Sequence, residues 1–74
     1  MRYMTTIRFI DAVARAGSIR RAADELAITS TALNRRILAV EEELGWPIFE
    51  RMARGVRLNS AGEIYIHHIR NQLS

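Results

Sequence analysis

The sequence has no cysteine, which excludes a disulfide framework and a thiolate metal site. No run of about 18 apolar residues is present, so no segment is predicted to cross a membrane as a helix. The first residues do not form a signal-peptide core, because Arg8 and Asp11 interrupt the apolar positions. A length of 74 residues suits one domain with a shallow core. We therefore expect a single cytoplasmic domain that spans no membrane.

Lysine is also absent, because all eleven basic residues are arginine. Arginine suits planar, bidentate contact with phosphate or guanine, although a GC-rich genome would produce the same bias. The net charge is only +3, but residues 1–37 hold seven arginines against three acids, a local balance of +4. Residues 38–74 hold four arginines against five acids, a balance of −1. This clustering is consistent with a nucleic-acid footprint.

The patterns that build catalytic sites are missing as well. The sequence contains no glycine-rich phosphate loop, no Cys/His ligand set and no HExxH motif. Glu41, Glu42 and Glu43 are consecutive on an expected helix, so their carboxylates fan around it and do not converge as an acid/base pair. His67 and His68 diverge by about 100° on a helix and cannot chelate one ion together. The sequence therefore predicts no enzyme, no metal site and no cofactor.

The stretch from Thr29 to Gly45 has a long amphipathic helical pattern. Thr29 can accept hydrogen bonds from the first free backbone N–H groups, and Gly45 can end the helix. The apolar stripe consists of Leu33, Ile37, Val40 and Leu44. The residues expected opposite the stripe or on its flank are Ser30, Thr31, Asn34, Arg35 and Leu38. A helix that is polar and basic at its front and acidic at its back would point its front at a polyanion.

Two helices are expected before this one. Residues 3–16 follow helical spacing, and Gly17 is a natural residue to end that helix. Ser18 can cap a second, shorter helix that runs through Ala27. Only Ile28 and its neighbours separate this helix from the next, so the pair is a helix-turn-helix candidate. The glycine that is usual in such a turn is missing.

Arg20 and Arg21 lie in the first turn of the second helix. A cation is poorly placed there against the helix dipole unless an anion lies nearby. A phosphate would be one such anion, and exposure to solvent with no specific role is the alternative. Both interpretations stay open on the sequence alone.

Residues 48–58 have the pattern of a small β-hairpin that follows Pro47, which bars helix continuation. The tip at residues 53–55 places Arg54 where it can extend outward. An arginine on a hairpin beside a recognition helix can enter the narrow, negative minor groove of DNA, and a solvated loop arginine is the alternative. For Arg51, on the strand, we expect an ion pair with Glu41 on the preceding helix.

The last helix is expected to start at Asn59 or Ser60, and Ser60 with Glu63 has capping-box spacing. Its apolar residues are Ile66, Ile69 and Leu73 on one side, Tyr65 at the edge of that side, and Ile64 elsewhere. A stray apolar residue such as Ile64 suggests a surface for a partner.

Three segments of the sequence together resemble a known protein family. They are AVARAGSIRRAADELAITSTALNRRI, EEELG followed by one residue and PIFER, and RGVRLNSAGE. In this order and spacing the chain resembles the N-terminal DNA-binding domain of LysR-type transcriptional regulators over residues 7–73. The resemblance implies a mainly α, winged helix-turn-helix fold with a three-helix core, a β-hairpin wing and a C-terminal linker helix. Residues 1–74 would be this one domain, residues 59–74 would begin the dimerisation helix, and the effector-binding domain would be absent.

The resemblance also implies partners and site residues. The partner would be double-stranded DNA with a dyad-symmetric site. A homodimer would bind this site in the cytoplasm, at the nucleoid. Residues 29–44 would lie in the major groove and residues 48–58 at the minor groove. No membrane, cofactor or small-molecule ligand is expected for this fragment. The base-facing residues would be Ser30, Thr31, Asn34 and Arg35, and the wing residue would be Arg54. Phosphate contacts would come from Ser18, Arg20, Arg21 and Arg36. The dimerisation residues would be Ile64, Tyr65, Ile69 and Leu73.

The sequence departs from the family pattern at three places on the expected recognition helix. Ser30 and Thr31 replace a common Gln-Pro pair, and Asn34 replaces a small serine. Leu38 stands where a basic residue is common, so one phosphate contact would be missing, and Arg36 projects toward the other flank. We therefore expect an altered operator preference. The alternative function is a small helical protein-interaction domain whose basic face docks on an acidic partner.

Overall fold

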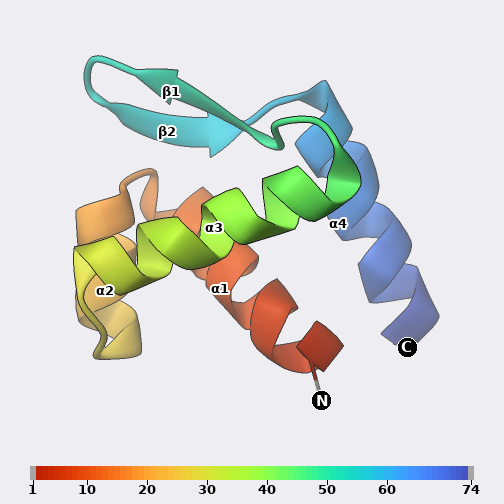
Figure 1. The fold of residues 1–74 in the computed structure, drawn as a ribbon, viewed down its shortest axis with the longest axis horizontal. Coiled ribbons are helices and arrows are strands. Elements are labelled where there is room, and N and C mark those ends of the chain that lie inside the picture. The colour runs from red at the N-terminus through yellow and green to blue at the C-terminus, as the bar shows by residue number, and fades with distance from the viewer. Residues whose placement is uncertain (1, 74) are drawn as a thin grey trace.

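The computed structural model describes the backbone of residues 2–73 and the side chains of residues 5–71. Four helices and one hairpin follow one another along the chain (Figure 1). They are α1 (Arg2–Ala16), α2 (Ile19–Leu26), α3 (Ser30–Leu44), β1 (Phe49–Met52), β2 (Gly55–Leu58) and α4 (Ser60–Leu73). The mainly helical fold with a small hairpin that the sequence predicts is confirmed.

The second and third helices begin at the side-chain caps that the sequence predicts. The Ser18 hydroxyl oxygen accepts from the backbone N–H of Arg21 at 3.2 Å, and Thr29 Oγ1 accepts from that of Ala32 at 3.0 Å. Both cap residues have the extended backbone that such a cap requires. Each cap satisfies a backbone donor that would otherwise lack a partner in the first turn.

The turn between α2 and α3 closes without a glycine. Ala27 adopts the left-handed backbone conformation, with φ of 59°, that a glycine would provide without strain. The backbone N–H of Ile28 then donates to the Ala23 carbonyl at 3.0 Å. A non-glycine residue in this conformation costs about 1–2 kcal/mol, so the packing of the two helices must hold the turn.

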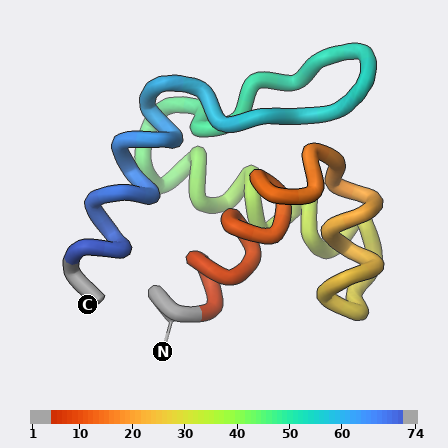
Figure 2. Tube along the Cα trace, turned by 180° about the vertical axis from the view of Figure 1, so that it is seen from behind, coloured from red at the N-terminus to blue at the C-terminus, as the bar shows by residue number. Residues whose placement is uncertain are grey.

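The core lies where α1, α2 and α3 meet, under the hairpin. In Figure 1 α3 runs across the front and α1 crosses behind it, and Figure 2 shows α1 from the other side. Leu33 and Ile37 of α3 are fully buried, and Val40 and Leu44 pack partly buried against the same core. The other fully or nearly fully buried core residues are Ile10, Ala12, Val13, Ala22, Ala23, Ile48, Phe49, Val56 and Ile66. The expected apolar stripe of α3 is therefore confirmed, and it fixes which face of α3 is left outside.

The hairpin is anchored to the end of α1 by a backbone contact at Gly17. Its strands are antiparallel, with Phe49 opposite Leu58 and Met52 opposite Gly55, which leaves Ala53 and Arg54 as the loop. The backbone N–H of Val56 donates to the Gly17 carbonyl at 3.1 Å at the end of α1. A Cβ at Gly55 would lie 2.2 Å from that same carbonyl oxygen, so the close approach requires glycine there.

The start of α4 differs in detail from the prediction. Asn59 is the N-cap, because its Oδ1 accepts from the Gly62 backbone N–H at 2.7 Å while its Nδ2 donates to the Pro47 carbonyl at 2.9 Å. Of the two expected caps the structure uses Asn59, and Ser60 with Glu63 forms no capping box because Ser60 is already inside the helix. Asn59 therefore joins the last helix to the segment that precedes the hairpin.

The expected ion pair between Glu41 and Arg51 is wrong. Glu41 Oε2 accepts instead from two backbone N–H groups, those of Ile48 at 2.8 Å and Phe49 at 3.2 Å. Both of these residues are buried, so their N–H groups could not easily turn to water. Glu41 thus ties the start of the hairpin to the second half of α3, and Arg51 remains exposed.

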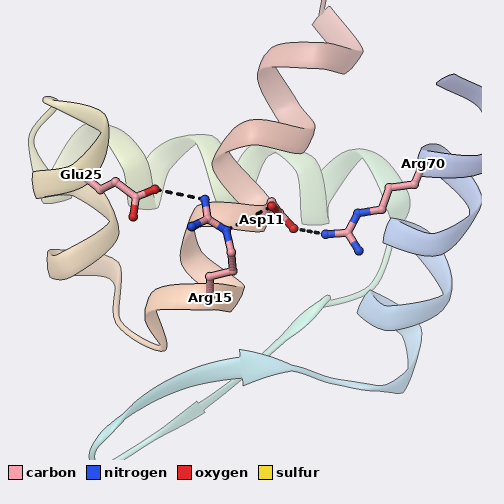
Figure 3. Close-up of polar contacts among 4 residues, drawn as sticks. All are labelled: Asp11, Arg15, Glu25 and Arg70. Atoms are coloured by element: carbon pink, nitrogen blue, oxygen red, sulfur yellow. Dashed lines mark hydrogen bonds and ion pairs between the residues drawn. The ribbon is translucent and has the colours of Figure 1, made fainter. Parts of the chain in front are cut away.

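A line of ion pairs connects α2, α1 and α4 on the surface (Figure 3). Arg15 of α1 contacts Glu25 of α2 at 3.1 Å and Asp11, one turn earlier on α1, at 3.2 Å. Asp11 also pairs with Arg70 of α4. We call these four residues the Asp11 network. Each pair is largely exposed, so each contributes only about 0–1 kcal/mol.

The Glu41 hydrogen bonds lead to the first testable prediction. Glu41→Ala should lower the free energy of unfolding by about 1–3 kcal/mol, because two buried N–H groups lose their acceptor. Glu41→Gln keeps an acceptor oxygen and should lose less. Urea denaturation followed by circular dichroism measures both values.

Glu42→Ala is the matched control, since Glu42 neighbours Glu41 on α3 but is exposed. Its effect should stay within about 0.5 kcal/mol. Equal losses for Glu41→Ala and Glu42→Ala would show that the loss comes from helix propensity or net charge and not from the hairpin anchor.

Candidate nucleic-acid interface

The outward face of α3 carries exposed polar side chains in its first two turns. Ser30, Thr31 and Arg35 are exposed, and within the part of the chain that the structure describes their side chains form no hydrogen bond or ion pair. This agrees with the positions predicted for them opposite Leu33 and Ile37. Unpaired donors and acceptors on an exposed helical face are available to an external partner without breaking an internal contact.

Asn34 is less exposed to solvent than the sequence suggested. The residue is half-buried, and its Oδ1 atom is buried without a hydrogen-bond partner. The difference arises because position 34 lies on the flank of the helix, about 100° from Leu33, and not directly opposite it. A buried acceptor without a partner costs about 1–3 kcal/mol, which a rotation of the side chain toward solvent or a polar partner would relieve.

Arg36 projects to the other flank of α3, as its position in the helix predicts. Its guanidinium carbon lies 5.0 Å from the centre of the Phe9 ring of α1, within the range of a cation–π contact. This contact joins α3 to α1 and explains the placement of Arg36 without a phosphate. The phosphate contact assigned to Arg36 therefore stays a prediction that this geometry does not support.

The first turn of α2 holds two further cations. Arg20 and Arg21 are exposed, and neither forms an ion pair among the described residues. Ser18 is half-buried and its oxygen already accepts from the Arg21 N–H, which leaves its hydroxyl hydrogen free to donate. The three positions are compatible with an anion at the start of α2, where the helix dipole also favours negative charge.

The hairpin presents two unpaired arginines. Arg54 is exposed in the loop, and Arg51 is exposed on β1. Arg57 is different, because it pairs with Glu50 on the opposite strand at 3.1 Å. The sequence did not predict that Arg51 is unpaired, because it assigned Arg51 to an ion pair with Glu41. Pro47 was a signal against that pair. The turn it imposes after α3 leaves backbone N–H groups from which Glu41 accepts instead.

These positions lie toward the same end of the molecule. The start of α3, the helix α2 and the hairpin tip are together at one end in Figure 1, and the reverse view in Figure 2 agrees. The acidic residues Glu42 and Glu43 lie on the later turns of α3, toward the other end. The exposed arginines of α2, of the hairpin tip and of the first two turns of α3 therefore lie toward the same end of the fold.

The outer side of α4 has one prominent apolar residue. Ile64 is 71% exposed, whereas Tyr65 is half-buried. Ile69 is only 5% exposed because it packs inside its own domain, so its expected role at a dimer contact stays a prediction. The side chain of Leu73, also expected at a dimer contact, lies outside the described residues.

Residues 2–73 contain no helix that is long and apolar enough to cross a membrane. Among the described residues no group of three or more metal-binding side chains lies together.

Comparisons with known proteins agree on one family. Residues 4–63 match the family described as bacterial regulatory helix-turn-helix proteins, lysR family. Over 68 residues, 92% of this chain, the sequence is 38% identical to the HTH-type transcriptional regulator TfdT of Cupriavidus pinatubonensis. The chain spans 30% of the length of TfdT, and 23% and 41% of the length of two other curated regulators that it matches.

Similar solved structures include complexes with DNA. The crystal structure of the CbnR DNA-binding domain in complex with DNA has a TM-score of 0.82 and 34% identity, over 99% of this chain and 83% of that one. The complex of the BenM DNA-binding domain with benA site 1 DNA has a TM-score of 0.82 and 33% identity, over 93% of this chain and 78% of that one.

Proposed function

The chain belongs to the LysR family of bacterial helix-turn-helix regulators, and from this premise we propose that it binds double-stranded DNA in a sequence-specific manner, with α3 in the major groove. The observation that carries the proposal is the outward face of α3, whose polar side chains have no internal partner. The family is one of transcriptional regulators and not of enzymes. The similarity to two DNA-binding domains that were crystallised with DNA supports the same conclusion.

Base contacts come from the first two turns of α3. Ser30 and Thr31 have short hydroxyl side chains that both donate and accept hydrogen bonds. Asn34 can contact adenine through N6 and N7 once its side chain turns outward, because its Oδ1 is buried in the free chain. Arg35 is long enough for either a guanine or a phosphate. The operator preference therefore depends chiefly on these four positions.

Contacts to the DNA backbone and the minor groove come from the neighbouring elements. Arg54 at the hairpin tip enters the minor groove, where A/T-rich sequence narrows the groove and strengthens its negative potential. Ser18, Arg20 and Arg21 at the start of α2 contact phosphates, and the exposed Arg51 is added to them. Phosphate contacts supply most of the affinity and make it depend on salt.

A homodimer on a dyad-symmetric site completes the proposal. Residues 1–74 form the DNA-binding domain of a regulator that acts at the nucleoid in the cytoplasm, and residues 59–74 begin the helix through which two copies meet. Ile64 is the exposed apolar residue of that helix and its central contact, with Tyr65 at the edge. Ile69 supports the helix from inside its own domain.

Two variants of α3 test the function and separate specificity from affinity. Asn34→Ala should change the preferred base at one symmetric pair of positions, by about 1–3 kcal/mol per contact, with little change in salt dependence. If Arg35 contacts a phosphate, Arg35→Ala should weaken all duplexes alike and reduce the slope of log K against log[salt] by about one unit. Site selection from random duplexes, followed by salt titrations, measures both effects.

The unmodified chain serves as the reference in the same titrations. A binding constant that does not change with salt concentration, or equal affinity for single-stranded and double-stranded DNA, would contradict the DNA-binding proposal. That result would favour a protein-interaction domain that docks on an acidic partner. An unchanged preferred site in Asn34→Ala would remove this residue from the base contacts.

The wing makes a separate prediction. Arg54→Ala should weaken binding by roughly 1–3 kcal/mol at sites with A/T-rich flanks and by less at G/C-rich flanks, because only the narrow groove rewards an inserted arginine. Arg57→Ala is the matched control on the same hairpin, since Arg57 is paired with Glu50. Equal losses on both kinds of flank would reduce Arg54 to an ordinary phosphate contact.

Assembly is tested on α4. Ile64→Glu should shift the chain toward monomer in sedimentation velocity and abolish cooperative binding to two half-sites, because it places a charge in an apolar contact. The melting temperature should stay nearly constant, since Ile64 is 71% exposed in the single domain. Glu63→Gln, at the neighbouring exposed position, should leave assembly unchanged. A dimer that persists in Ile64→Glu would contradict the proposed contact.

A further inference from the structure

Leu38 is an exposed apolar residue on the face of α3 that otherwise carries polar side chains. Its exposed fraction is 49%, whereas the preceding residue, Ile37, is 1% exposed. Leu38 therefore belongs to the outward face and not to the core stripe. It lies one turn after Asn34 and three residues after Arg35, so the three side chains share one patch of helix surface.

The position of Leu38, and not its exposure alone, calls for an explanation. Single exposed leucines are common on protein surfaces and usually have no function. Leu38, however, lies between the hydrogen-bonding residues of the first two turns and Glu42, which is exposed one turn later on the same face. A carboxylate is repelled by phosphates, which disfavours close contact of Glu42 with the DNA backbone. Leu38 is thus the apolar residue of this face that adjoins its hydrogen-bonding side chains.

We propose that Leu38 selects thymine, by packing its side chain against the thymine 5-methyl group in the major groove. The inference rests on the proposed placement of α3 in that groove. The 5-methyl group of thymine is the apolar feature among the major-groove edges of the four bases. A leucine side chain has no donor or acceptor, so it gains from this methyl group. Against cytosine N4 or guanine O6 it would instead remove a polar atom from water without replacing its hydrogen bond.

The distance along α3 places this thymine relative to the base that Asn34 contacts. Leu38 follows Asn34 by four residues, a rise of about 6 Å along the helix, which is close to two base-pair steps of about 3.4 Å. Helical side chains lean toward the helix N-terminus, so the Leu38 methyl groups lie over the turn that carries Asn34. The thymine should therefore lie within about two steps of the base pair that Asn34 contacts.

The test removes only the methyl group from the DNA. The preferred site is first selected from random duplexes with the unmodified 74-residue chain. Each thymine of a half-site is then replaced in turn by deoxyuridine, which keeps every hydrogen-bonding group of the base. At one symmetric pair of positions the dissociation constant should rise about fourfold per half-site, the value expected for the loss of one buried methyl group. Other thymine positions should change little.

Substitutions at Leu38 then assign the effect to this residue. In Leu38→Ala and in Leu38→Asn the duplexes with thymine and with deoxyuridine should bind equally, because the apolar contact is already lost. Leu38→Met is the matched control, since it keeps an apolar side chain of similar volume and should keep most of the discrimination. All three variants should melt close to the unmodified chain, because Leu38 is not part of the core.

The outcomes separate this inference from the function on which it rests. Tight, salt-dependent duplex binding without any effect of deoxyuridine overturns the role of Leu38 and leaves the proposed function intact. Discrimination that survives in Leu38→Ala assigns the methyl contact to another residue and overturns the inference as well. The absence of salt-dependent duplex binding overturns both. A position-specific deoxyuridine effect that disappears in Leu38→Ala and persists in Leu38→Met confirms it.

Discussion

The burial of one narrow stripe of α3 is the constraint on which the rest of the structure depends. Leu33 and Ile37 are fully buried against the other helices, and this fixes the rotation of α3 about its own axis. A rotation by one residue, about 100°, would place polar side chains in the core and apolar ones in water. The buried residues Leu33 and Ile37 therefore determine which side of α3 faces outward. Specificity can change at that face while the fold stays the same.

Local rules account for most of the fold, and contacts between distant residues account for what the sequence did not predict. The caps at Ser18 and Thr29 and the end of α3 at Gly45 depend on short stretches, so they could be predicted from the sequence. The contact of Glu41 with the backbone of residues 48 and 49 could not, because it requires the path of the chain after Pro47. The stacking of Arg36 on Phe9 likewise depends on how α1 crosses α3.

The same division applies to the candidate site. The polar face of α3 follows from helical periodicity, and the arginine at the hairpin tip follows from the turn. The half-burial of Asn34 and the lack of an ion pair at Arg51 do not follow from local patterns. Both depend on contacts between residues that are distant in the sequence. Internal acids pair with Arg15, Arg57 and Arg70. This internal pairing leaves the arginines of α2, of the first two turns of α3 and of the hairpin tip without an acidic partner among the described residues, although the net charge is small.

The Asp11 network joins α1 to α4 by ion pairs, and the strength of these pairs depends on the ionic strength of the solution. One carboxylate holds Arg15, which leads to α2, and Arg70, which lies near the end of α4. Because the two arginines are exposed, added salt screens these pairs and weakens them, while Ile66 and Ile69 of α4 stay packed in their own domain. Two kinds of contact thus hold the last helix: apolar packing, which salt does not screen, and the ion pair between Arg70 and Asp11, which salt weakens.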